Sequence, residues 1–225
     1  MSIIEIQNVS KTYKTEHGPL KVLDDVSFNV DRNSWTMLIG ASGSGKTTLL
    51  QMLGALDKPD VGKILFDNKN LSSTGSFAAA RIRRRGVGFV FQSFNLLPEL
   101  NALENIMLPG LFSNSKDKPV KQRAKELLEM VKLSDRATHK PNELSGGEQQ
   151  RIAIARALIN NPEVILADEP TGNLDPKTSE VIINLFKDLN EKQNKTIVMV
   201  THNHSLKPFA SKVLQLDKGR IVNRA

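Results

Sequence analysis

Residues 40–48 read GASGSGKTT, and this stretch decides the fold. It follows the apolar run WTMLI (35–39) and precedes TTLLQMLGAL (47–56), whose apolar residues recur at helical spacing. Such a loop is either a flexible linker or a cradle for an anion. Linkers are not bounded by a strand and a helix, so the setting favours the cradle. The pattern GxxxxGK[ST] therefore predicts a phosphate-binding loop, in which backbone N–H groups and a helix N-terminus face the anion.

Within this loop the side chains have separate expected roles. Lys46 is expected to reach the β- and γ-phosphates of a nucleotide, and the Thr47 hydroxyl to ligate magnesium. The residues predicted to contact the nucleotide here are Gly40, Ser42, Gly43, Gly45, Lys46, Thr47 and Thr48.

A metal carboxylate is expected at the end of a neighbouring strand. The stretch EVILADE (163–169) carries four apolar residues, 164–167, and then Asp168 and Glu169. Ligands bind at the carboxyl edge of parallel sheets, so Asp168 is predicted to coordinate the metal. Glu169 is expected to point to the other side of the strand and to polarise the attacking water. By itself such a pair is usually a helix cap or a solvated turn, but the glycine loop favours the functional interpretation.

Composition narrows the class of protein. The chain has 225 residues, 39% hydrophobic and 24% charged, and no apolar window reaches the roughly 18 residues of a membrane span. The start, MSIIEIQNVSKTY, lacks the layout of a secretory signal, so we expect a cytosolic chain. The absence of cysteine excludes disulfides and thiolate metal sites. The net charge is +7, but the arginine cluster at 81–85 has no interleaved aromatics, so nucleic-acid binding is not expected.

Hydrophobic patterning predicts a mixed α/β chain. Strand-like runs fill the first 40 residues, whereas helix and strand alternate after residue 146, as expected for parallel strands with crossover helices. The last run, VLQLDKGRIV (213–222), reads as a hairpin. From about 93 to 142 the pattern is helical, with expected breaks at Pro98, Pro109 and Pro119. We expect one domain, 1–225, in which 1–92 and 143–225 form the core and 93–142 a helical subdomain.

The stretch LSGGE (144–148) opens a further predicted helix, QQRIAIARALI. Serine and two glycines give this helix an N-terminus with free N–H donors and no lysine of its own. The simpler explanation is an ordinary N-cap, for which Ser145 is a good residue. The residues of this stretch do not decide between the two.

Taken together, these motifs resemble the nucleotide-binding subunit of ABC transporters, over almost the full length of the chain. The family's Q-loop appears as Gln92 in GFVFQSF, its D-loop as 173–175 (NLD) and its switch histidine as His202 in VTHN. Tyr13, the single tyrosine, stands where the family has an aromatic ring that stacks on adenine. The fold implied is a P-loop NTPase core with a parallel sheet, an N-terminal antiparallel β subdomain and an inserted α-helical subdomain.

The resemblance also implies a function and a set of site residues. It implies an active ATPase that uses ATP and Mg²⁺, working as a head-to-tail homodimer with ATP between the glycine loop of one copy and the LSGGE of the other. Ser145 and Gly147 would contact nucleotide in trans, and Asp175 would align the two sites. The implied catalytic residues are Glu169, His202, Gln92 and Lys46, and the implied magnesium ligands are Thr47, Gln92 and Asp168.

Partners and location follow from the same resemblance. Separate membrane permease subunits would dock through the Q-loop and the helical subdomain, and the chain would sit peripherally on the cytoplasmic side of the inner membrane. The stretches 91–109, 147–158 and 167–175 are similar to the subgroup that serves lipoprotein-releasing complexes and macrolide or antimicrobial-peptide exporters, in which dimer closure moves periplasmic domains. Two alternatives stay open: a signalling subunit, as in the cell-division ABC complex, and a soluble ABC ATPase that acts on nucleic acid.

Overall fold

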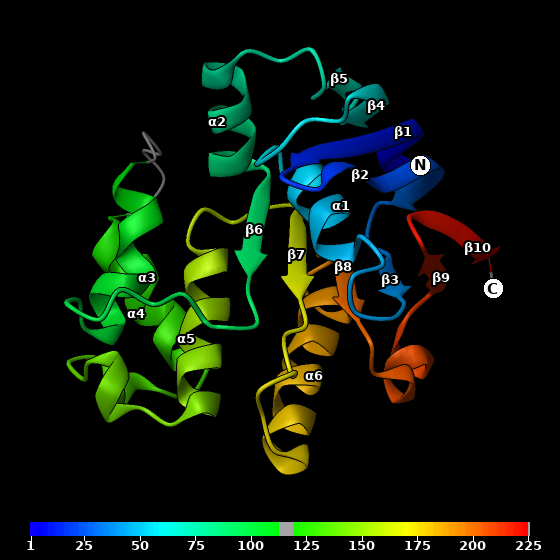
Figure 1. Cartoon of the computed structure of the whole chain (residues 1–225). Coiled ribbons are helices and arrows are strands. Elements are labelled where there is room, and N and C mark those ends of the chain that lie inside the picture. The colour runs from blue at the N-terminus through cyan, green and yellow to red at the C-terminus, as the bar shows by residue number, and fades with distance from the viewer. Residues whose placement is uncertain (113–118, 225) are drawn as a thin grey trace.

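The protein contains two β-sheets with helices packed around them (Figure 1), and the computed structural model describes residues 1–112 and 119–224. The first sheet is antiparallel and has the strand order β2-β1-β4-β5. Its strands are β1 (Ser2–Thr15), β2 (Gly18–Asp31), β4 (Val61–Phe66) and β5 (Lys69–Asn70). The predicted β-rich opening is thereby confirmed.

The second sheet is mostly parallel and has the order β10-β9-β3-β8-β7-β6. Five neighbouring strands run parallel, and β10 pairs antiparallel with β9 as the predicted hairpin. The strands are β3 (Trp35–Ile39), β6 (Val87–Val90), β7 (Val164–Asp168), β8 (Thr196–Thr201), β9 (Lys212–Asp217) and β10 (Arg220–Arg224).

Alternation along the apolar central strands creates two cores, one on each face of the parallel sheet. In β7, for example, Ile165 belongs to one cluster of buried residues and Leu166 to the other. The first cluster joins the sheet to α3, α4, α5 and α6, whereas the second joins it to α1 and the antiparallel sheet. Because both faces are covered, the strands are apolar at nearly every position, as is typical of parallel sheets.

Six α-helices and three short 3₁₀ helices complete the described chain. The α-helices are α1 (Lys46–Leu53), α2 (Ser76–Arg85), α3 (Ala102–Leu111), α4 (Val120–Met130), α5 (Gly146–Leu158) and α6 (Pro176–Glu191); the 3₁₀ helices are η1 (Ser134–Arg136), η2 (Pro141–Glu143) and η3 (His204–Phe209). Helices α3, α4 and α5 pack together at one side of the parallel sheet (Figure 1). Among the described residues no helix has the length and apolar character that crossing a membrane requires.

The segment 93–142, expected to be helical, contains α3, α4, η1 and η2, and its residues 113–118 lie outside the described residues. The expected break at Pro109 is wrong, because α3 continues through this proline to Leu111. Contacts on both sides hold the helix: a capping box formed by Asn101 and Glu104 fixes its start, and Gly110 packs closely on Val120 and Ile159. These contacts outweigh the hydrogen bond that proline removes.

Candidate active site

A cavity of about 460 Å³ lies between the loop that opens α1 and the ends of β7 and β8. Ten of its lining residues are predicted site residues, and two, Leu20 and Val22, were not predicted. The predicted ones are Ser42, Gly43, Gly45, Lys46, Thr47, Thr48, Gln92, Asp168, Glu169 and His202. Leu20 and Val22 come from β2, where Leu20 is exposed and Val22 half-buried; the only signal in the sequence was the alternation of these two apolar residues with Lys21.

The glycines of the 40–48 loop are required by its backbone path. Gly43 and Gly45 have φ of 76° and 102°, a region that side chains disfavour. A Cβ on Gly45 would come within 2.7 Å of the Val22 carbonyl oxygen, and one on Gly40 within 2.1 Å of the Leu216 carbonyl oxygen. The loop can therefore pack against its neighbours only without side chains at these positions, which is how a phosphate cradle keeps its N–H groups open.

The N-terminus of α1 suits an anion. No side chain caps it and its first turn contains no acidic residue. The neighbouring Ser44 hydroxyl is buried and has no hydrogen-bond partner in the described part of the chain. Uncapped N–H groups and a positive helix end are what a phosphate requires, so this cradle fits the nucleotide that the sequence predicts.

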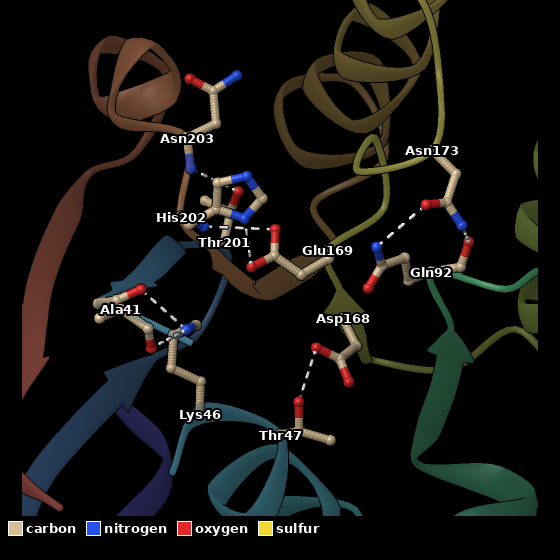
Figure 2. Close-up of polar contacts among 11 residues, drawn as sticks. Ala41, Lys46, Thr47, Gln92, Asp168, Glu169, Asn173, Thr201, His202 and Asn203 are labelled. Carbon is tan, nitrogen blue, oxygen red and sulfur yellow. Dashed lines mark hydrogen bonds and ion pairs between the residues drawn. The ribbon is translucent and has the colours of Figure 1, made fainter. Parts of the chain in front are cut away.

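Lys46 is the first residue of α1 and is almost fully buried, at 7% exposed. Its ammonium donates to the carbonyl oxygens of Gly40 and Ala41 at 2.9 and 2.8 Å (Figure 2). No carboxylate among the described residues forms an ion pair with it. The charge is therefore held beside the loop and remains available to an anion.

Thr47 and Asp168 bring two oxygen donors together at the metal position that the sequence predicts. The Thr47 hydroxyl donates to Asp168 Oδ1 at 3.2 Å (Figure 2). Burial raises the pKa of Asp168, as does the nearby charge of Glu169, while the Thr47 hydrogen bond acts in the opposite direction. In the described residues there is no cluster of three metal-binding His, Cys, Asp or Glu side chains. One carboxylate and one hydroxyl beside a phosphate cradle fit Mg²⁺, which takes few protein ligands and completes its shell with phosphate and water.

Strand alternation predicts that Glu169 points to the opposite side of the strand from Asp168. The structure differs from this prediction, because β7 ends at Asp168 and the alternation stops there. Glu169 has a left-handed backbone, with φ of 44°, and lines the same cavity as Asp168. Its Oε1 lies 3.0 Å from His202 Nδ1, and the His202 backbone N–H donates to its Oε2 at 3.3 Å (Figure 2). The carboxylate is thus mostly buried while the imidazole remains 62% exposed.

Gln92, which follows β6, forms a pair with Asn173. Its Nε2 donates to Asn173 Oδ1 and its backbone oxygen accepts from Asn173 Nδ2, both at 3.2 Å (Figure 2). Asn173 does not line the cavity itself, and the sequence offered no sign of this contact between residues 81 positions apart.

Tyr13 lies outside the cavity lining, opposite Leu20 in the β1/β2 ladder. Its hydroxyl donates to Asp57 Oδ2 at 2.6 Å, and Lys11 lies 5.1 Å from the ring centroid. Burial and the hydrogen bond to Asp57 raise the pKa of Tyr13. The ring therefore has a fixed position at the edge of the site.

The LSGGE stretch also lies outside the lining of this cavity. Ser145 is the N-cap of α5 and forms a capping box with Glu148, so the simpler interpretation of this stretch describes the single chain correctly. Gly147 is buried and a Cβ there would meet Thr178 Cγ2 at 2.3 Å, whereas Ser145 is exposed. Asp175 caps α6 by accepting from the Thr178 N–H.

Comparisons with known proteins agree with this geometry. The family model described as ABC transporter matches residues 23–172. The lipoprotein-releasing system ATP-binding protein LolD of Geobacter metallireducens is 43% identical, and the match covers 98% of each chain. The macrolide export ATP-binding/permease protein MacB of Chlorobaculum tepidum is 45% identical over 98% of this chain and 34% of its own length.

A solved structure extends the likeness to three dimensions. The ATP-binding cassette MJ0796, from Methanocaldococcus jannaschii, was solved as a dimer in a post-hydrolysis state bound to ADP and Pi. It superposes with a TM-score of 0.91 at 43% identity, covering 99% of this chain and 97% of that one. Fold, cradle and relatives agree. The chain therefore belongs to the ABC transporter family, as a subunit that binds ATP with Mg²⁺ and hydrolyses it.

Proposed function

We propose that two copies of this chain close on ATP and thereby drive a separate membrane subunit. One observation carries the proposal: the LSGGE stretch stands outside the chain's own nucleotide cavity, although it opens a helix whose N-terminus can face phosphate. A second copy can bring its LSGGE to this cavity when ATP is present, so ATP binding favours the closed dimer. The dimeric state of the solved relative supports this arrangement.

Each residue of the cavity then has a role. Lys46 and the loop N–H groups bind the phosphates, while Thr47, Asp168 and Gln92 hold Mg²⁺. The bound metal ion would neutralise charge on the phosphates. Glu169 accepts the proton of the attacking water, and His202, already in contact with Glu169, binds the γ-phosphate. Tyr13 stacks on adenine, and Asp175, at the start of α6, faces the second copy.

A groove beside the helical layer suits the membrane partner. It has a volume of about 640 Å³ and lies between α2, β6, α3 and α5. Its lining is mainly apolar, with Phe77, Phe91, Leu108 and Phe112 among the residues. Amphipathic helices bind to grooves of this kind by inserting apolar side chains.

The charge around the groove identifies the kind of helix that it accepts. Arg81 and Arg84 of α2 line it together with Arg156 of α5. Arg81 is exposed and has no carboxylate partner among the described residues, and the buried Nε of Arg84 has no hydrogen-bond partner there. An acidic, amphipathic helix of the membrane subunit is therefore the occupant that we propose. The chain then sits peripherally on the cytoplasmic side of the inner membrane.

The test is co-purification with a membrane subunit encoded beside this chain that carries an extracytoplasmic domain. The double variant Arg81→Glu, Arg84→Glu should lose the complex and retain ATPase activity in isolation. The matched control Lys187→Glu changes an exposed charge on α6, away from the groove, and should leave the complex intact. Retention of the complex by the arginine variant would exclude the groove as the docking surface.

The names of the relatives favour lipoprotein release or macrolide export as the output over the two alternatives. LolD and MacB are both named for movement of a cargo, and neither name refers to signalling or nucleic acid. Loss of cargo release upon deletion of this chain, rescued by the intact chain but not by Glu169→Gln, would support a transport role. Normal cargo movement in the deletion strain would contradict it.

A further inference from the structure

The contact between Gln92 and Asn173 determines which atom of the Gln92 amide is available to the cavity. Gln92 lines the cavity together with Thr47 and Asp168, whereas Asn173 lies outside the lining, in the loop between β7 and α6, and contacts Gln92 (Figure 2). Oxygen is the atom that magnesium accepts from an amide, so the orientation of this group decides whether Gln92 can act as a ligand.

Hydrogen-bonding capacity fixes that orientation in two steps. A backbone carbonyl can only accept, so the NH₂ group of Asn173 must face the Gln92 carbonyl oxygen, as the 3.2 Å contact has it. This leaves Asn173 Oδ1 facing the Gln92 side chain, which must present its own NH₂ group in return. Gln92 Oε1 is then directed away from Asn173 and is left for another partner.

Gly172 allows this arrangement. A Cβ at this position would come within 2.8 Å of Gln92 Nε2 and 3.2 Å of its Cδ. The Gly172 N–H also donates to the Glu169 carbonyl oxygen at 3.0 Å, which ties the turn to the catalytic strand end. The Gln92 amide therefore packs against the turn at Gly172, and this turn is held by its hydrogen bond to the Glu169 backbone.

We infer that Asn173 is a positioning residue that holds the Gln92 amide with its oxygen toward the magnesium site. The inference rests on the proposed function, in which Gln92 is a magnesium ligand. It adds that the loop leading to Asp175 controls this ligand, so that a movement of 173–175 turns the Gln92 amide. Groups that orient a metal ligand typically contribute roughly tenfold or more to metal affinity.

The experiment measures the affinity for a fluorescent, non-hydrolysable ATP analogue, once in excess EDTA and once in excess Mg²⁺. The dissociation constant in EDTA divided by the dissociation constant in Mg²⁺ reports how much Mg²⁺ tightens binding, independently of turnover. Asn173→Ala should reduce this ratio by roughly tenfold and leave the affinity in EDTA unchanged. A merely structural role would change the affinity in EDTA as well.

A double-mutant cycle identifies the route of the effect. Gln92→Ala alone should reduce the ratio at least as much, and adding Asn173→Ala to it should have no further effect, because the partner is already lost. The ratio for Asn173→Asp should lie between those of the parent and Asn173→Ala, since a carboxylate still accepts from Gln92 Nε2. The control Asn29→Ala, an exposed position in β2, should match the parent.

The outcomes separate this inference from the proposed function. If Gln92→Ala lowers the ratio and Asn173→Ala does not, the positioning role is wrong while Gln92 remains a magnesium ligand. If the two losses add, Asn173 acts independently of Gln92 and the inference also fails. If Gln92→Ala leaves the ratio at the parent value, both the inference and the proposed role of Gln92 are overturned.

Discussion

Glu169 illustrates how a single residue can combine strain with function. Its left-handed backbone, with φ of 44°, costs a non-glycine residue about 1 to 2 kcal/mol. Its N–H nevertheless donates to the Val200 carbonyl oxygen at 2.9 Å, and its carboxylate is held by His202. These contacts retain the conformation and place the carboxylate on the cavity that Asp168 also lines.

Replacement of this carboxylate tests its role as the base. Glu169→Gln keeps the size and most hydrogen bonds of the side chain but cannot accept a proton, so we expect turnover to fall by about 100-fold or more. Affinity for ATP should remain within about twofold of the parent, since the phosphate cradle is unchanged. Steady-state phosphate release and nucleotide titration measure the two quantities. The control Glu191→Gln, at the exposed end of α6, should hydrolyse at the parent rate; a similar rate in Glu169→Gln would remove the residue from the mechanism.

At the residue scale, residue spacing in the sequence predicted the positions of the site residues. It did not predict side-chain directions where the backbone departs from regular strand geometry. The loop at 40–48 and the carboxylate of Asp168 follow from glycine spacing and from the end of an apolar strand. The direction of Glu169 could not be predicted, because alternation holds only while the strand continues and β7 ends at Asp168. The contact between Asn173 and Gln92 could not be predicted either, because the two residues are 81 positions apart in the sequence.

The start of α5 is held by a charged capping residue, Glu148, so we expect this element to be sensitive to acid. The Ser145 N–H donates to Glu148, and this bond, the Ser145 hydroxyl and Arg136 outweigh partial burial and lower the pKa of Glu148. A folded pKa below the ordinary 4.5 stabilises the fold fully above that value and progressively less as the pH falls through the folded pKa.

We therefore expect Glu148→Gln to show a weaker loss of unfolding free energy below pH 4.5 than the parent. Denaturant titrations between pH 3 and 7 measure this difference. The control Glu129→Gln, at an exposed position of α4, should follow the parent curve. Parallel curves for Glu148→Gln and the parent would show that the capping carboxylate does not contribute to acid sensitivity.

The junction between α1 and β6 depends on the absence of one methyl group. A Cβ on Gly54, at the C-terminus of α1, would come within 1.8 Å of the Phe89 ring, and that ring stacks on Phe91 at 5.5 Å between centroids. Gly54→Ala should lower the unfolding free energy by about 1 to 3 kcal/mol, as overpacking does. At Gly75 an added Cβ would meet no heavy atom of another part of the chain within 4 Å, so Gly75→Ala should lower the unfolding free energy by less than about 1 kcal/mol. Urea titrations compare the two; equal effects would show that Phe89 yields at little cost.

At the element scale, the apolar pattern predicted most strands and helices, but α2 was not predicted. Its sequence SFAAARIRRR has one buried residue, Ala79, so it lacks an apolar stripe at helical spacing. The break expected at Pro109 does not occur, because packing around Gly110 stabilises the last turn of α3 despite the proline. Tertiary contacts that the local pattern does not contain decided the end of α3.

At the scale of the whole molecule, the two sheets and their cores give the chain one complete cradle and one separate helix start. The phosphate cradle lies in the loop between β3 and α1, and the carboxylates of Asp168 and Glu169 line the cavity at the end of β7. The start of α5 instead packs into α6 through Gly147 and leaves Ser145 exposed. In the proposed function such a chain needs an opposing copy to enclose the nucleotide, and the sequence implied this only through the family resemblance.

This arrangement predicts that a bulky charge at the exposed serine blocks assembly without blocking binding. In the Glu169→Gln background, which is expected to retain ATP, Ser145→Arg should abolish ATP-driven dimerisation in sedimentation experiments. Nucleotide affinity of the monomer should stay at the parent value, because Ser145 does not line its own cavity. Loss of the N-cap costs about 1 kcal/mol, so a thermal melt accompanies the measurement. Ser73→Arg, at an exposed position between β5 and α2, is the matched control and should dimerise normally. Dimers that persist in Ser145→Arg would mean that the two copies do not meet through this helix start.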